Sequence, residues 1–122
     1  MNLKPILKTL MLIGFLQIDA EIYLYLAISG PQDAQNIAEA LKIPNRQVYH
    51  SLKSLRQKQI VAALHGHPAR YSASSFEEVL DRFKQLSIED ARRIEQKKQG
   101  ALAIWRTIIT NMEKQSQKES FS

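Results

Sequence analysis

The stretch that most constrains the fold of this chain is GPQDAQNIAEALKIPNRQVYHSLKSLRQK, residues 30–58. Apolar residues recur in its first half at steps of three, one and three, the spacing of one helix face: Ala34, Ile37, Ala38 and Leu41. In its second half they recur at steps of four and three: Val48, Leu52 and Leu55. The corner between the halves is short, and Asn45 after it is a favourable helix N-cap. The pattern predicts a helix-turn-helix, with one helix from Asp33 to Leu41 and another from Asn45 onwards.

Elements on both sides of this motif complete a larger unit. Before it, apolar spacing predicts one helix over residues 3–13 and a second helix from Asp19, as its N-cap, to Ser29. After it, two strand-like runs, residues 60–65 and 69–73, flank a Gly-His-Pro turn sequence. A helix-turn-helix followed directly by a β-hairpin is a winged helix, and its hairpin, the wing, is expected against the DNA backbone.

The C-terminal part of the chain has the pattern of a long helix over residues 75–115. Ser75, with Glu78 three residues on, forms a capping-box pattern, and apolar or small residues then recur at heptad steps with one stutter after Ser87. About forty helical residues span roughly 60 Å, more than one small domain covers, so a second copy of the chain is the expected partner. A break near Ser87 or Gly100, giving a helical hairpin, stays open as an alternative. The expected dimer contacts are Phe83, Ile94, Ala101, Trp105, Ile108 and Met112.

Charge is distributed unevenly along the sequence. Of the net charge of +5, residues 1–74 carry +4, from eight basic and four acidic side chains, and residues 75–122 carry +1. No carboxylate occurs between Glu39 and Glu77, a window that holds six Lys or Arg residues and all three histidines. A basic window over and after the second motif helix indicates a phosphate-backbone partner; the alternative is a solvated basic face without one.

Outward positions of the second motif helix and of the wing supply the predicted DNA contacts. Asn45, Arg46 and Gln47 stand in the first turn of that helix, where recognition helices meet base edges, and their side chains suit bidentate base contacts. Lys53 and Arg56 suit phosphate contacts or remain solvated. The full set of predicted contacts is Asn45, Arg46, Gln47, His50, Ser51, Lys53, Arg56, His67 and Arg70.

Other site chemistry has little support in the sequence. The histidines at positions 50, 65 and 67 suggest a metal-site hypothesis, but no cysteine or carboxylate lies near them in sequence to complete one. No phosphate-cradling glycine loop and no serine–histidine–aspartate spacing is present, so neither catalysis nor a metal or cofactor is expected. Tyr49 is expected to be half-buried beside the core rather than to read a base.

The N-terminal run MNLKPILKTLMLIGFL is apolar but favours a packed helix over a signal peptide or a membrane span. Lys8 interrupts it, and the uncharged stretch from Thr9 to Ile18 is too short to span a bilayer as a helix. The chain has no cysteine, which fits a reducing cytoplasm. No membrane partner is therefore expected.

Several phrases between residues 18 and 71 form a pattern that a known family shares. The phrases are Ala20-Glu21-Ile22-Tyr23-Leu24, Gly30-Pro31, Ile37-Ala38-Glu39-Ala40-Leu41, Ile43-Pro44, Val48-Tyr49, Ser51-Leu52, Leu55 and Gly66-His67-Pro68-Ala69-Arg70-Tyr71. In these phrases the chain resembles the winged-helix domain of the TrmB-like archaeal transcription regulators. Two places depart from the family pattern: Phe15-Leu16-Gln17 replaces a glycine-leucine-threonine helix entry, and Gln59 replaces the glycine before the first wing strand.

The resemblance implies a DNA-binding fold, a dimeric regulator and an archaeal, cytoplasmic setting. Longer family members carry an effector-binding domain after the coiled coil, so the chain resembles a short form without that domain, and sugar sensing is not expected of it. The MarR-like and ArsR-like winged helices share this layout and remain alternative families.

The sequence therefore predicts a mainly α-helical chain with a small β-hairpin. A winged helix-turn-helix DNA-binding domain is expected over residues 1–74, a long helix or helical hairpin for dimerisation over 75–115, and a flexible tail over 116–122. The predicted function is transcription regulation by a homodimer on a palindromic operator in double-stranded DNA. The alternatives are a winged-helix protein-interaction module and a DNA-binding subunit of a hetero-complex. The residues specify neither the operator, nor the sign of regulation, nor a small-molecule effector.

Overall fold

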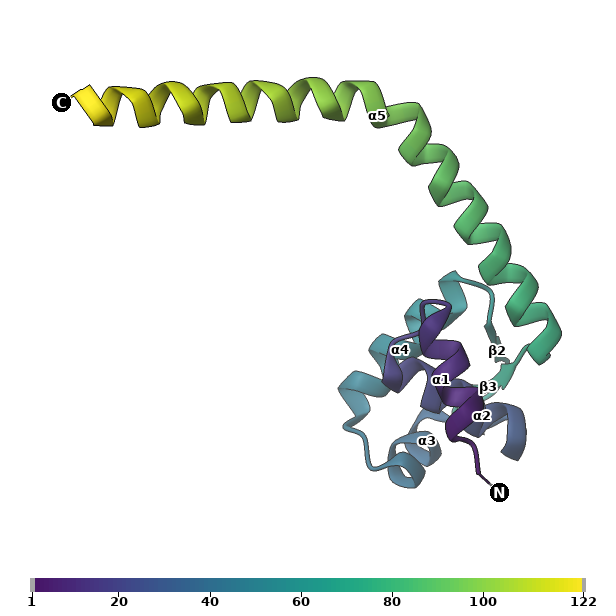
Figure 1. The fold of residues 1–122 in the computed structure, drawn as a ribbon. Coiled ribbons are helices and arrows are strands. Elements are labelled where there is room, and N and C mark those ends of the chain that lie inside the picture. The colour runs from purple at the N-terminus through teal and green to yellow at the C-terminus, as the bar shows by residue number, and fades with distance from the viewer. Residues whose placement is uncertain (1, 122) are drawn as a thin grey trace. The chain divides into compact units, whose positions relative to one another are not determined.

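The computed structural model describes the backbone of residues 2–121 and the side chains of residues 2–116. The elements are α1 (Lys4–Leu12), α2 (Gln17–Ser29), β1 (Gln32–Asp33), α3 (Ala34–Leu41), α4 (Asn45–Gln57), β2 (Val61–Leu64), β3 (Arg70–Ala73) and α5 (Phe76–Phe121) (Figure 1). The chain divides into two units, Met1–Gln85 and Leu86–Ser122. The first unit contains every element except the greater part of α5. None of the helices between residues 2 and 121 is long and apolar enough to cross a membrane.

The helix-turn-helix forms from α3 and α4, as predicted. The Asp33 carboxylate caps α3 by accepting a hydrogen bond from the backbone N–H of Asn36 at 2.8 Å. Lys42 ends α3 in the left-handed conformation, with φ at 57°. The prediction that Asn45 caps α4 is wrong. Pro44 occupies the N-cap position in an extended conformation, and its carbonyl accepts the N–H groups of Gln47 and Val48, which leaves Asn45 as the first helical residue.

The N-terminus of α2 also differs from its prediction. The helix begins at Gln17, because Leu16 is the extended residue before it, and Asp19 therefore lies inside the first turn rather than at the cap. The Asp19 side chain is buried. A carboxylate in the first turn still complements the partial positive charge of the helix N-terminus.

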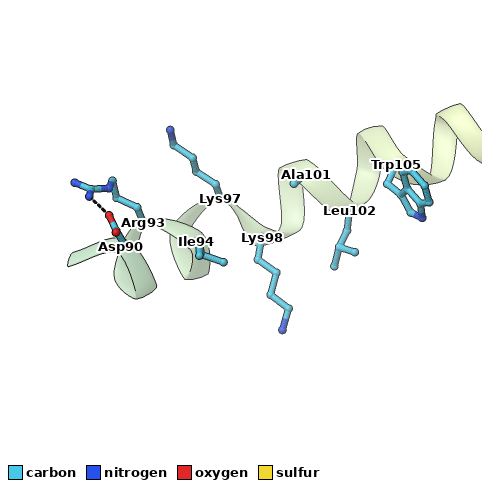
Figure 2. A pocket seen from close by; sticks show the side chains of 8 residues that line it. All are labelled: Asp90, Arg93, Ile94, Lys97, Lys98, Ala101, Leu102 and Trp105. Atoms are coloured by element: carbon cyan, nitrogen blue, oxygen red, sulfur yellow. Dashed lines mark hydrogen bonds and ion pairs between the residues drawn. The ribbon is translucent and has the colours of Figure 1, made fainter. Parts of the chain in front are cut away.

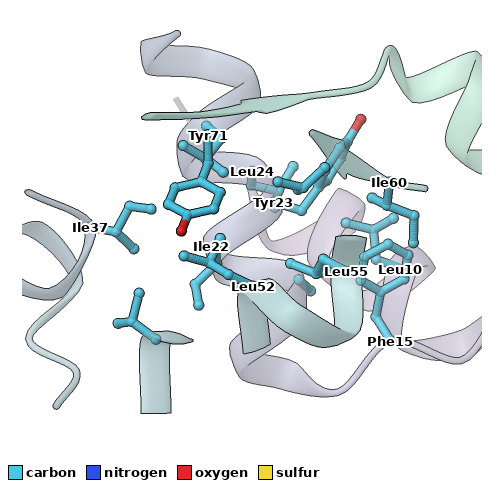
Figure 3. Close-up of a cluster of buried hydrophobic side chains, with 14 of the residues drawn as sticks. Leu10, Phe15, Ile22, Tyr23, Leu24, Ile37, Leu52, Leu55, Ile60 and Tyr71 are labelled. Atoms are coloured by element: carbon cyan, nitrogen blue, oxygen red, sulfur yellow. The ribbon is translucent and has the colours of Figure 1, made fainter. Parts of the chain in front are cut away.

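A single hydrophobic core joins α1, α2, α3, α4 and the hairpin. The apolar face of α4 meets α2 through Leu52 and Leu55, and Ile37 joins them from α3 (Figure 3). Each large apolar side chain that is fully buried here contributes about 1.5–3 kcal/mol relative to an exposed one. The core side of α4 is thereby fixed, and with it the face that α4 turns to solvent.

The wing is the predicted hairpin with one strand added. β2 and β3 pair antiparallel, with Val61 opposite Ala73 and Leu64 opposite Arg70. β1 pairs with the other edge of β3, so the strand order is β1-β3-β2. β1 was not predicted, because two polar residues next to a helix N-cap have no alternating pattern. It pairs with Arg70 and Tyr71, so it ties the turn end of β3 to the residues that start α3.

Hydrogen bonds around Ser74 close the hairpin. The Tyr23 hydroxyl donates to the Ser74 carbonyl at 2.7 Å, and the Ser74 N–H donates to the Ile60 carbonyl at 2.8 Å. The Ser74 hydroxyl donates to the Gln59 carbonyl at 3.2 Å. Burial, together with the negative charge of Glu78, raises the pKa of Tyr23 above its usual value, so its hydroxyl keeps its proton for this bond.

Gln59 adopts a left-handed backbone conformation, with φ at 61°, at the position where the family pattern has glycine. A side chain there costs about 1–2 kcal/mol, partly offset by the extra backbone entropy that glycine loses on folding. We therefore expect Gln59→Gly to raise the free energy of unfolding by about 0.5–1 kcal/mol. The measurement is urea unfolding followed by circular dichroism. As a control, Gln57→Gly, at the right-handed last residue of α4, should not raise the free energy of unfolding.

α5 begins as predicted, since the Glu78 N–H donates to the Ser75 hydroxyl oxygen at 3.2 Å. Of the two alternatives, the structure has the single helix, which continues past Ser87 and Gly100. The predicted flexible tail, residues 116–122, falls on α5, whose described backbone is helical to Phe121, while Ser122 and the side chains after Ser116 lie outside the described residues.

Phe83, which was predicted as a dimer contact, is buried within the first unit. Its side chain is 8% exposed and its ring stacks on Phe15, with centroids 4.6 Å apart. A Cβ on Gly14 would lie 3.4 Å from the Phe83 ring, so the loop before α2 also lies against it. Phe83 therefore belongs to the core of the first unit, together with Val79 one turn earlier.

Candidate nucleic-acid interface

α4 turns a basic and polar face to solvent. Its core side consists of Val48, Leu52 and Leu55, each at most 1% exposed. The other side carries the exposed side chains of Asn45, Arg46, Gln47, His50, Lys53 and Arg56. This outward face contains six of the predicted contacts, and no carboxylate occurs on α4. Its donors match the acceptors of phosphates and of purine edges.

Ser51 is the predicted contact that the structure removes from this face. Its side chain is only 4% exposed, although it was expected to point outwards. Ser51 precedes Leu52 and follows Val48 by three residues, so the helix rotation carries it towards the core side of α4. A buried hydroxyl there has no access to a nucleic acid.

Tyr49 is more exposed than expected, whereas Ser51 is more buried. It was expected to be half-buried, but 57% of its side chain is exposed. Its neighbour Val48 is fully buried, and one residue along a helix rotates the side chain by about 100°, which carries Tyr49 out of the core. The aromatic character of the residue suggested partial burial, whereas its position on the helix sets its exposure.

The wing presents its turn to solvent. His65, Gly66, His67 and Pro68 are all exposed between β2 and β3, and the His67–Pro68 peptide bond is cis. Arg70 lies at the turn end of the hairpin, opposite Leu64, where it is exposed and its guanidinium donates to the Pro31 carbonyl at 3.0 Å. The guanidinium has further N–H donors, so Arg70 still offers positive charge beside the wing.

Two charged groups near α4 are occupied by other interactions. Lys58, at the end of α4, is half-buried with its ammonium 5.8 Å from the centre of the Phe83 ring. Asp33 is engaged in the α3 cap. Within the described residues, no group of three or more His, Cys, Asp or Glu side chains is placed to hold a metal ion. The chemistry of this surface is that of a basic, hydrogen-bond-donating face.

The second unit carries an apolar stripe along α5. Ile94, Ala101, Trp105, Ile108 and Met112 follow one another at steps of seven, four, three and four, the spacing of a heptad seam. The large side chains of this stripe are exposed, with Ile94 at 69% and Trp105 at 58%. Figure 2 shows Ile94, Leu102 and Trp105 projecting from the helix, with Lys98 between them and the Arg93–Asp90 ion pair beside them.

The fold and the face of α4 define a winged helix-turn-helix protein. Two solved structures share this fold. One is a possible transcriptional regulator from Methanosarcina mazei Go1, with a TM-score of 0.53 and 16% identity over 70% of this chain and 78% of that chain. The other is the YusO protein from Bacillus subtilis, with a TM-score of 0.52 and 20% identity over 85% of this chain and 81% of that chain. At such identities the likeness shows the fold alone.

The family follows from the sequence comparisons. The profile of the sugar-specific transcriptional regulator TrmB matches residues 10–77. The HTH-type sugar sensing transcriptional regulator TrmBL1 of Pyrococcus furiosus is 31% identical over 91 residues. That match covers 75% of this chain but only 27% of the relative, so the chain spans about a quarter of the relative's length. The chain belongs to the TrmB family of transcriptional regulators, whose members are not enzymes.

Proposed function

We propose that this protein is a cytoplasmic transcription regulator that binds double-stranded DNA as a homodimer. The observation that carries the proposal is the outward face of α4, which is exposed and basic and has no carboxylate. Family membership and the winged fold support it. A module that docks on another protein would have no reason to exclude carboxylates from the whole stretch between Glu39 and Glu77.

The contacts divide by chemistry into base readers and phosphate contacts. Arg46 suits a bidentate contact to guanine, and Asn45 and Gln47 suit adenine, all from the first turn of α4. His50 lies on the same face, one turn after Arg46. The remaining contacts go to the backbone from Lys53, Arg56, His67 and Arg70.

The homodimer would form through the stripe of Ile94, Ala101, Trp105, Ile108 and Met112. Exposed apolar side chains at heptad spacing bury their surface when a second helix of the same kind packs on them. Two identical winged units related by a two-fold axis would read two inverted half-sites, so the operator would be a palindrome.

A salt titration tests the DNA contacts directly. If Lys53, Arg56 and Arg70 each neutralise one phosphate, the logarithm of the binding constant should fall with the logarithm of salt concentration at a slope of about −3 per protomer. The slope would come from fluorescence anisotropy of a labelled duplex at several salt concentrations. A flat dependence would contradict DNA binding.

Light scattering at micromolar concentration tests the assembly separately. A mass of twice the chain is expected. A monomer that still binds duplex with the stated salt slope would contradict the homodimer and leave the DNA contacts in place.

A further inference from the structure

Tyr49 is the tyrosine that the core leaves out. Tyr23 and Tyr71 are buried, and Tyr25 is half-buried, whereas 57% of the Tyr49 side chain is exposed. Within the described residues, no hydrogen bond, ion pair or ring contact engages Tyr49. A large aromatic ring without a partner on an otherwise polar helix face has apolar surface available for a ligand.

The position of Tyr49 on α4 places it among the proposed DNA contacts. Arg46 precedes it by three residues and Lys53 follows it by four, so both are its neighbours on the helix surface. The Cα–Cβ bonds of a helix tilt towards its N-terminus, so the ring covers the turn that begins with Asn45. The apolar ring is thus flanked by positive charge, at the end of α4 that would enter the groove.

We propose that Tyr49 determines specificity by packing its ring against the C5-methyl group of a thymine in the major groove. The inference rests on the proposed function, since it adds a residue to the same interface. The thymine methyl is the apolar group that base pairs present in the major groove, and aromatic side chains are among its partners. The flanking Arg46 and Lys53 would hold the neighbouring polar edges and phosphates while the ring covers the methyl group.

The test removes the methyl group from the DNA and the ring from the protein in turn. Sequences bound by the full wild-type chain are first selected from a random duplex pool. Each thymine of the selected site is then replaced by uracil, which lacks only the methyl group. Binding is measured on a duplex that contains a single half-site. At one thymine position of that half-site, replacement by uracil should weaken wild-type binding about fourfold, because one buried methyl group is lost.

Two variants complete the cycle. Tyr49→Ala should bind the thymine duplex about fivefold to tenfold more weakly than wild type and should bind thymine and uracil duplexes equally. Tyr49→Phe keeps the ring and should keep the fourfold preference for thymine. Because Tyr49 is exposed, both variants should unfold at the wild-type urea midpoint, which separates a lost contact from a lost fold.

The possible outcomes separate the Tyr49–thymine contact from DNA binding itself. If wild-type protein binds duplex but no uracil substitution weakens it, the Tyr49 inference fails and the DNA-binding proposal stands. The same holds if Tyr49→Ala retains the preference for thymine. If wild-type protein binds no duplex at all, both fail.

Discussion

Replacing Arg46 by alanine is expected to weaken binding to a single half-site duplex by about tenfold to hundredfold, because one bidentate contact to guanine discriminates by about 1–3 kcal/mol. Arg46 is exposed in the first turn of α4, so the fold should be unaffected. Fluorescence anisotropy at one fixed salt concentration gives the affinity. Selection from a random pool should also show a relaxed preference at the guanine that Arg46 reads.

Arg82→Ala is the matched control for this change. Arg82 is exposed near the start of α5, beside Glu78 and Asp81, and its loss removes the same unit of charge. Its effect on affinity should be within about twofold. Equal losses in the two variants would mean that Arg46 acts only through overall charge and that α4 does not read bases there.

Trp105→Glu is expected to convert the protein to a monomer at micromolar concentration. Trp105 is 58% exposed in the middle of the heptad stripe, and burying an unpaired carboxylate between two helices costs several kcal/mol. Affinity for an inverted repeat should then fall towards that of a single half-site, a loss of about a hundredfold or more. Light scattering and anisotropy on the two duplexes measure the two effects.

Thr110→Glu introduces the same charge five residues later, on the face of α5 away from the stripe. It should leave both the mass and the affinity for the inverted repeat unchanged. Dissociation by both variants would indicate that added charge, rather than the stripe, governs assembly. A Trp105→Glu protein that remains a dimer would place the interface elsewhere.

The parts of the fold that were predictable from sequence are those set by local periodicity. The helix-turn-helix, the hairpin and the Ser75–Glu78 start of α5 each arise from residues within a few positions of one another. The exposed side chains of α4 were mostly predictable for the same reason, since three buried residues fix the rotation of the whole helix.

The errors occurred where distant residues decide the outcome. Phe83 fits a heptad pattern, but Phe15 and Gly14, far away in sequence, draw it into the core. Ser51 is buried and Tyr49 is exposed, the opposite of what a polar and an aromatic side chain suggested. Their positions on the α4 helix, rather than their side-chain types, decide their burial. β1 has a partner strand almost forty residues away, and no local pattern marks it.

The pairing of β1 with β3 has a consequence for the energetics of recognition. A free hairpin would sample many orientations and would lose that freedom only when a duplex immobilised it. Here Asp33, which caps α3, is also the strand partner of Arg70, so the N-terminus of α3 is joined by strand pairing to the turn end of the hairpin. The entropy of orienting the wing is therefore lost on folding. In the proposed complex, the hairpin would meet the duplex with its orientation relative to α3 already set.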